Sequence, residues 1–209
     1  MTEIAARTER ARRVPTDVAI SPDAVALGAL AVIVGVLLTF TWGTWGDLGA
    51  DTGYDAVAGA RVAHGHLPYV SFVYYYGPLA PFLLGFATLV GGGGLGPGMA
   101  LGLVVACAIV LATYVLGRMY AGVIGGFLAA AITAAVAFSP TNFSFVMPHA
   151  YSATLGLLAS LCFLIAVGRY AQFQTRRWLV GAGFAAGLVA LTRRNGLAEA
   201  GTRQLAPLW

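Results

Sequence analysis

Lysine is absent from this sequence of 209 residues, and charged side chains of any kind are scarce. Asp, Glu, Lys and Arg make up 10% of the residues, whereas about a quarter is usual in a soluble globular domain. Hydrophobic residues make up 59%. This balance excludes a soluble globular domain and predicts an integral membrane protein. The basic residues are arginines in tails and short connections, without the clustered basic face of a nucleic-acid-binding protein, so we expect no nucleic-acid partner.

Cysteine and the common catalytic motifs are also scarce. The two cysteines, Cys107 and Cys162, each lie in an apolar run, where a small buried side chain is their usual role. The sequence contains no phosphate-loop GKS or GKT and no HExxH zinc motif. Most of the 28 glycines therefore indicate close approach of membrane helices and not a nucleotide site.

Long apolar runs predict an all-α fold, a polytopic transmembrane helix bundle. The first run, at 24–42, is long enough to cross a hydrocarbon core of about 30 Å. Four more candidate segments lie at 99–116, 121–138, 150–167 and 178–191. We interpret residues 1–23 as a cytoplasmic tail and not a cleaved signal peptide, because they are long and their arginines precede a complete membrane span. The predicted location is the plasma membrane.

A sixth apolar segment, 78–90, is short for a full crossing. If all six segments crossed, the arginines at 118 and at 169–177 would lie outside, against the positive-inside tendency. If the short segment does not cross fully, both groups of arginines lie in the cytoplasm. We therefore prefer this second arrangement, which also brings the 139–149 loop to the same face as the polar loop after the first span.

This polar loop carries three aspartates, Asp47, Asp51 and Asp55, spaced by four. A charge close to hydrocarbon costs at least about 2.5 to 3.5 kcal/mol, so we interpret the apolar segments as a scaffold that holds the loop at the extracytoplasmic surface. Helical spacing over 54–62, ended by Gly65, predicts a short amphipathic helix in the membrane interface. On a continuous helix the three carboxylates would form one stripe, but Gly49 and Gly53 count against a continuous helix here.

Two roles are open for the aspartates. Asp51 or Thr52 could cap the interfacial helix, and Asp55 could close a capping box with Thr52. For Asp51 we favour a functional role as a general base or a metal ligand, with Asp47 and Asp55 in support. Among the histidines, His149 is the best candidate because its loop is expected on the same face as the aspartates.

Three short motifs occur in a characteristic order: Asp51-Thr52-Gly53-Tyr54, then GHLPY at 65–69, then YGPL at 76–79. This order resembles the GT-C superfamily of polyprenyl-phosphate-sugar-dependent glycosyltransferases, which includes protein O-mannosyltransferases and the bacterial lipid A aminoarabinose and galacturonic acid transferases. Residues 147–150 are similar to the family's second extracytoplasmic loop, and 183–193 to the helix before its basic loop. The resemblance spans residues 24–193.

The resemblance implies that Asp51 is the catalytic base of an inverting glycosyl transfer from a polyprenyl-phosphate sugar. The acceptor would be a hydroxyl group of a glycan, a lipid or a protein. Arg61, His149 and Arg193 are the candidates for the donor phosphate, and Tyr69 and Tyr76 are candidate substrate contacts. Some members of the family use a divalent metal ion and others do not, so the cofactor is left open.

Two departures from the family pattern support an alternative. Ser71 occupies a position that is acidic in many relatives, and relatives are several hundred residues long. Residues 194–209 lose the apolar periodicity, which favours an aberrant or truncated C-terminus and an inactive fragment. The alternative function is a non-catalytic multi-pass membrane protein, either an assembly subunit or a transporter-like bundle. A transporter would be expected to place polar residues at mid-membrane depth, where this sequence has almost none.

Overall fold

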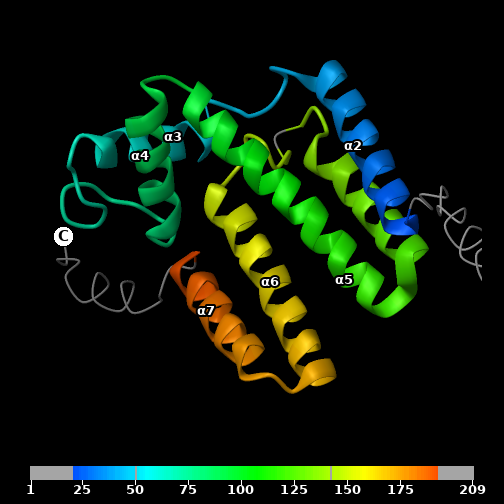
Figure 1. Ribbon diagram of the computed structural model, residues 1–209. Helices are drawn as coiled ribbons and strands as arrows, with labels where there is room; N and C mark the ends of the chain where they lie inside the picture. Colours follow the sequence, from blue (N-terminus) through cyan, green and yellow to red (C-terminus); the bar gives the residue numbers. More distant parts are fainter. Residues whose placement is uncertain (1–20, 50, 142, 193–209) are drawn as a thin grey trace, which may run out of the picture.

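The computed structural model describes residues 21–49, 51–141 and 143–192, and these residues are all helical or irregular, without a strand (Figure 1). The helices are α2 (Pro22–Thr41), α3 (Asp51–Ala63), α4 (Leu79–Gly91), α5 (Gly96–Ala137), α6 (Tyr151–Phe173) and α7 (Arg176–Thr192). Three of them, α2, α5 and α6, are long and apolar enough to cross a membrane. The predicted all-α membrane fold is confirmed at this level. The expected tail, apart from its last three residues, and the segment 194–209 lie outside the described residues.

Helix α5 folds back on itself at Ala121 and Gly122, whose backbone is not helical. Gly122 has φ +69°, a conformation that favours glycine. The two arms, 96–120 and 123–137, run side by side in opposite directions (Figure 1). They pack so closely that a Cβ atom on Gly117 would lie 2.9 Å from the Cα atom of Gly126. The two segments predicted at 99–116 and 121–138 correspond to these arms.

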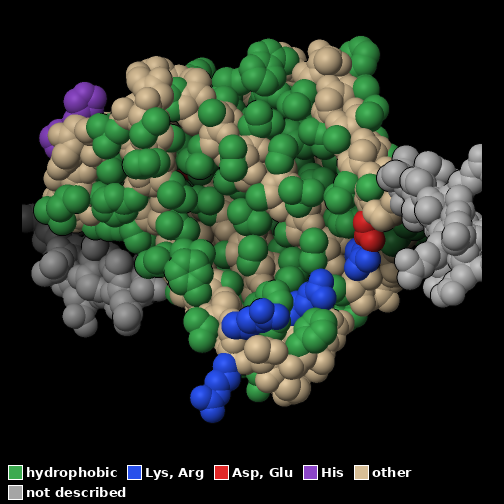
Figure 2. Space-filling view, viewed as in Figure 1, with side chains coloured by type: hydrophobic (Ala, Val, Ile, Leu, Met, Phe, Trp, Pro, Cys, Tyr) green, Lys and Arg blue, Asp and Glu red, His purple; other side chains and the backbone are tan. Residues whose placement is uncertain are grey.

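One end of the bundle, here called the arginine end, collects the start of α2, the turn of α5 and the α6–α7 connection. Arg118 forms an ion pair with Asp23, with 2.7 Å between Nη2 and Oδ2. Tyr120 packs beside Gly168, near the end of α6. Arginine side chains form a row along this end in Figure 2, and hydrophobic side chains are spread over much of the face seen there. The arginines at 118 and at 169–177 therefore lie at the same end of the bundle, as expected.

The opposite end, here called the site end, collects the end of α2, the 139–149 loop and both ends of α4. Trp45 Nε1 donates a hydrogen bond of 3.5 Å to the carbonyl of Phe138. Helix α4 begins just after Gly77, whose N–H donates to the carbonyl of Thr192 (3.3 Å), and ends where Gly91 packs against Pro97. Because α4 starts and finishes at the same end, it does not run the length of the bundle, as expected for the short segment 78–90.

Small residues form much of the core, which allows the helices to approach closely. Ala106, Ala130 and Ala134 are fully buried between the arms of α5 and the neighbouring helices. Large apolar side chains instead point outward, among them Val32 on α2 and Ile124 on α5, with 65% and 75% of their surfaces exposed. An inside of small residues and an outside of large apolar ones suits a bundle that is surrounded by lipid.

Candidate active site

Asp51, the first residue of α3, lies where three separate segments meet at the site end. Its Oδ2 atom accepts a hydrogen bond from the Tyr76 hydroxyl (2.5 Å) and lies 3.1 Å from His149 Nε2. Its Oδ1 atom accepts no hydrogen bond from the residues that the structure describes. The Asp51 side chain keeps 37% of its surface exposed. One carboxylate oxygen is therefore fixed and the other is open to an incoming hydroxyl, as a general base requires.

Buried contacts hold these segments together. Thr52 is buried and donates a hydrogen bond of 2.9 Å to the carbonyl of Pro148, which places the next residue, His149, beside Asp51. Tyr69 donates from its hydroxyl to the backbone carbonyl of Tyr76. Tyr69 also has φ +66°, which residues other than glycine rarely adopt. Tyr69 therefore positions the Tyr76 backbone.

Asp55 has a different environment from Asp51. It is fully buried, and its Oδ1 accepts from the Tyr74 hydroxyl (2.6 Å) while its Oδ2 accepts from the backbone N–H of Tyr151 (2.8 Å). Burial raises the pKa of Asp55, and the hydrogen bonds from Tyr74 and Tyr151 oppose that rise. Tyr151 opens α6, where Ala150 supplies no side-chain cap. Asp55, on the neighbouring helix α3, thus accepts a hydrogen bond from a backbone N–H at the start of α6, where such groups have no partner within the helix.

The alternative of a capping box between Asp55 and Thr52 is not what the structure shows. Both side chains point away from the start of their own helix, toward residues 148–151. The physical reason is that the start of α6 and the 148–149 backbone offer buried partners that would otherwise be unsatisfied. Capping is the correct role for Asp55, but the helix it caps is α6.

Asp47 does not join the other two carboxylates. It precedes α3, and its Oδ1 accepts a hydrogen bond of 2.9 Å from the backbone N–H of Gly49. The three aspartates do not form one stripe, because α3 begins only at Asp51. No group of three or more His, Cys, Asp or Glu side chains that could hold a metal ion occurs in the described ranges. Asp47 and Asp55 thus supply no ligand set with Asp51, since both oxygens of Asp55 are already occupied.

Of the two arginine candidates, the one that the structure describes, Arg61, does not reach Asp51. Arg61 lies ten residues further along α3, about 15 Å at 1.5 Å per residue, and its guanidinium lies over the Phe72 ring, 5.3 Å from the centroid. Arg193 lies outside the described residues. His149 is therefore the group nearest to Asp51 that can carry a positive charge, among those described.

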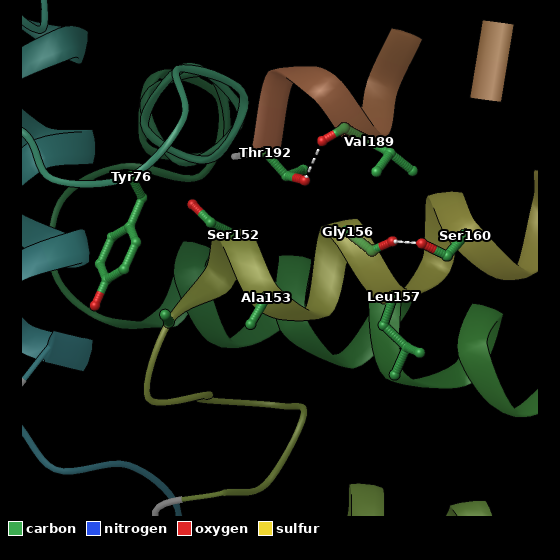
Figure 3. Close-up of a pocket in the computed structure, with 9 residues that line it drawn as sticks. Tyr76, Ser152, Ala153, Gly156, Leu157, Ser160, Val189 and Thr192 are labelled. Carbon is green, nitrogen blue, oxygen red and sulfur yellow. Dashed lines mark hydrogen bonds between the residues drawn. The ribbon is translucent and has the colours of Figure 1, made fainter. Parts of the chain in front are cut away.

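A groove of about 570 Å³ opens beside Tyr76 and runs between α6 and α7 (Figure 3). Its walls carry mostly small or hydroxyl-bearing side chains: Ala150, Ser152, Ala153, Gly156, Leu157 and Ser160 on the α6 side, and Val189 and Thr192 on α7. From Ser152 to Ser160 the groove follows α6 for about 12 Å. A Cβ atom on Gly156 would lie 2.9 Å from Thr192 Oγ1, so glycine sets the width there.

The hydroxyl groups of the groove differ in their hydrogen bonding. Ser160 donates to the carbonyl of Gly156 and Thr192 donates to that of Val189, both at 2.7 Å (Figure 3). Ser152 is buried, and its Oγ makes no hydrogen bond of normal geometry with a described residue. The mouth of the groove, where Ser152 and Tyr76 lie, is thus its more polar end.

The pairing of aspartates with tyrosines was missed from the sequence, although a signal for it exists. Asp51 and Asp55 are four residues apart and share one face of a helix, whereas Tyr74 and Tyr76 are two apart and share one side of an extended chain. Tyr74 pairs with Asp55 and Tyr76 with Asp51, while Tyr75 points outward and is 56% exposed. From the sequence, Tyr76 is a candidate substrate contact and Tyr74 has no assigned role. No pattern in the sequence indicates that Ser152 lines the groove.

The Tyr76 hydroxyl should titrate abnormally because of Asp51. The hydrogen bond to the Asp51 carboxylate, together with burial, raises the pKa of Tyr76 to about 12. We expect Asp51→Asn to lower this pKa toward the ordinary value of about 10. The measurement is phenolate absorbance at about pH 11, taken as the difference between each protein and its Tyr76→Phe counterpart, which cancels the other tyrosines. An unchanged difference in Asp51→Asn would contradict the hydrogen bond.

No protein-family model matches this chain, and neither a curated protein nor a solved structure does. The resemblance to the GT-C superfamily therefore rests on the residues of its motifs alone. A function must be argued from the chemistry of Asp51 and its neighbours and from the groove.

Proposed function

We propose that this chain is a GT-C-like glycosyltransferase module that moves a sugar from a polyprenyl-phosphate donor to a hydroxyl group of a glycan, lipid or protein acceptor. The observation that carries the proposal is the Asp51 carboxylate, which is partly exposed and anchored through Oδ2 only, next to Tyr76, a residue that lines a groove along α6. The order of the three motifs around Asp51, Pro68 and Pro78 supports the same assignment.

In the proposed reaction, Oδ1 of Asp51 takes the proton of the acceptor hydroxyl as the acceptor oxygen attacks the anomeric carbon. The bond from that carbon to the phosphate oxygen breaks, its electron pair leaves with the polyprenyl phosphate, and the configuration inverts. Tyr76 remains protonated, since its pKa is about 12, and it holds the carboxylate in place. His149, when protonated, supplies positive charge beside the departing phosphate.

The groove fits the lipid part of such a donor. It starts at Tyr76, whose hydroxyl donates to Asp51, so that a sugar and a phosphate would lie there, and it continues along α6, one of the helices that can cross a membrane. Its deeper walls include Leu157 and Val189, and the small Ala153 and Gly156 leave space between the helices. A polar mouth with a deeper apolar channel follows the same order as a polyprenyl phosphate, whose charged head precedes its hydrocarbon chain.

We further propose that the site end faces outward across the plasma membrane and that the arginine end lies in the cytoplasm. The positive-inside tendency supports this orientation. Within α2, α5 and α6 the charged residues are Asp23, Arg118 and Arg169, all at the arginine end. Charged groups therefore avoid mid-membrane depth in the described spans, which gives no support to a transporter. An assembly subunit would show no sugar transfer at all.

Filling the groove tests the proposal. Ala153 lines the groove and is exposed, so Ala153→Phe adds a ring there with little effect on packing. We expect the KM for a polyprenyl-phosphate sugar to rise at least about tenfold, equivalent to about 1.4 kcal/mol, with a smaller change in kcat. The assay is transfer of labelled sugar in proteoliposomes that contain the donor and an extract of candidate acceptors.

The matched control is Ala171→Phe, which changes an exposed alanine near the other end of α6. Equal KM values for the two variants would remove the groove from donor binding. Absence of any transfer by the unaltered protein, with a range of donors, would remove the glycosyltransferase function.

A further inference from the structure

Ser152, the second residue of α6, has a hydroxyl group without an acceptor among the described residues. The residue keeps only 4% of its surface exposed, and its Oγ atom makes no hydrogen bond of normal geometry there. Serine inside a helix often donates to the carbonyl four residues earlier, as Ser160 does to Gly156. The carbonyl four residues before Ser152 belongs to Pro148, which precedes α6 and accepts from Thr52. The place of Ser152 in the first turn of α6 therefore explains why its hydroxyl lacks an acceptor.

The Tyr74 hydroxyl lies near Ser152 but does not satisfy it. Tyr74 donates its own proton to Oδ1 of Asp55 at 2.6 Å. Burial raises the pKa of Tyr74, and Ser152 opposes that rise, so the two hydroxyl groups are close to each other. The Ser152 Oγ atom nevertheless lacks hydrogen-bond geometry with Tyr74. The proton of the Ser152 hydroxyl therefore remains available to another acceptor.

Ser152 belongs to the wall of the groove at its polar mouth. It lines the groove together with Tyr76 and Thr192, and in Figure 3 its hydroxyl points away from α6 on the side where these two residues lie. The hydroxyl of Tyr76 donates to Asp51, and that of Thr192 donates to the carbonyl of Val189. Among the described hydroxyl groups of the groove wall, that of Ser152 is thus the one left to donate to a ligand.

We propose that Ser152 donates a hydrogen bond to a phosphate oxygen of a polyprenyl-phosphate group in the groove. The identity of this ligand rests on the proposed function, to which the inference adds a binding residue. Inversion places the attacking oxygen and the leaving phosphate on opposite sides of the anomeric carbon. With the attacking oxygen at Oδ1 of Asp51, the phosphate lies beyond the sugar, toward the start of α6 and its Ser152 hydroxyl.

A phosphate oxygen suits this hydroxyl better than a neutral acceptor does. A hydrogen bond to an ionised acceptor is roughly twice as strong as one between neutral groups. Arg61, the described arginine candidate for the phosphate, lies over the Phe72 ring, so a donor on the groove wall supplements His149. The carboxylates of Asp51 and Asp55 belong to α3. They repel an anion, which favours a phosphate held on the α6 side of the mouth.

The test measures binding and needs no sugar transfer. Farnesyl phosphate, a short polyprenyl phosphate, is titrated into the full chain in detergent micelles by isothermal titration calorimetry. Farnesol, which has the same chain without the phosphate, is titrated in parallel. We expect Ser152→Ala to weaken the binding of farnesyl phosphate at least about tenfold, as for loss of a hydrogen bond to a charged group, and to leave the binding of farnesol within about twofold.

Thr154→Val is the matched control. Thr154 lies two residues further along α6, is 5% exposed and is not among the residues that line the groove, and its hydroxyl donates to the carbonyl of Tyr151 at 3.0 Å. This variant should bind both compounds as the unaltered protein does. Stability is a second readout: removal of a buried hydroxyl without an acceptor should leave the free energy of unfolding of Ser152→Ala unchanged or raise it. A lower value would make the hydroxyl a structural partner of Tyr74 and overturn the proposal.

The remaining outcomes separate this inference from the proposed function. Equal binding of farnesyl phosphate by Ser152→Ala and the unaltered protein, an equal loss for farnesol, or no binding at all would overturn it. Displacement of farnesyl phosphate by equimolar inorganic phosphate would assign the hydroxyl to a soluble anion and overturn the lipid ligand. Weaker phosphate binding in Ser152→Ala, with no sugar transfer by the unaltered protein, would support the inference and remove the glycosyltransferase function. Sugar transfer by the unaltered protein, with unchanged binding in Ser152→Ala, would do the reverse.

Discussion

Asp51→Asn is expected to lower sugar transfer by about 10²- to 10⁴-fold, the range that a positioned general base contributes. The amide keeps the shape of the side chain and can still accept the hydrogen bond from Tyr76, but it cannot take a proton from the acceptor hydroxyl. Because Asp51 is partly exposed at the edge of the bundle, the fold should tolerate the change. The measurement is kcat for transfer in proteoliposomes, with helix content from circular dichroism as the check on folding.

Asp47→Asn is the matched control. It removes the same charge four residues earlier, from a side chain whose described hydrogen bond is to the Gly49 backbone. We expect transfer by this variant to stay within about twofold of the unaltered protein, as for a surface change that touches no reacting group. If Asp51→Asn retains full transfer, or if both variants lose it equally, Asp51 is not the base.

Asp55→Asn is expected to destabilise the protein by about 3 kcal/mol. The Asp55 carboxylate is fully buried between two donors, the Tyr74 hydroxyl and the Tyr151 backbone N–H. An asparagine can accept only one of these hydrogen bonds, and its NH₂ group then faces the other donor. The start of α6 would lose its partner from α3, so the loss should appear in the free energy of unfolding, measured in mixed micelles of mild detergent and dodecyl sulfate.

Two comparisons make this second prediction specific. Tyr74→Phe removes one of the two hydrogen bonds and should cost less, about 1 to 2 kcal/mol. Asp47→Asn should change the free energy of unfolding by less than about 0.5 kcal/mol. A value for Asp55→Asn as small as that for Asp47→Asn would show that Asp55 is not the buried link between α3 and α6.

The two aspartate variants also separate chemistry from folding. Asp51→Asn should lose transfer and keep stability, whereas Asp55→Asn should lose stability first and activity only as a consequence. Tertiary structure makes this distinction, because Asp51 and Asp55 differ in the sequence only by one helical turn. Tyr74 and Tyr76, two residues apart on an extended segment, meet these carboxylates in turn.

The sequence by itself determined the class of the fold and the grouping of its arginines at one end of the bundle. Apolar runs of membrane-spanning length can only be helical in hydrocarbon, since every backbone N–H and C=O must be paired within the segment. The short length of 78–90 and the grouping of arginines at 118 and 169–177 were enough to predict that α4 stays at one end of the bundle. The same reasoning placed the 139–149 loop and His149 on the face of Asp51.

Tertiary structure alone decided the roles of individual polar residues. Spacing could not show that α3 begins at Asp51 and so leaves Asp47 outside, nor that Asp55 reaches the start of α6. It could not show the groove between α6 and α7, or that the Ser152 hydroxyl makes no hydrogen bond of normal geometry with a described residue. The reason is physical: burial and hydrogen-bond partners depend on which segments pack together. Segments 96 residues apart in the chain meet here, as in the contacts of Asp55 with Tyr151 and of Thr52 with Pro148.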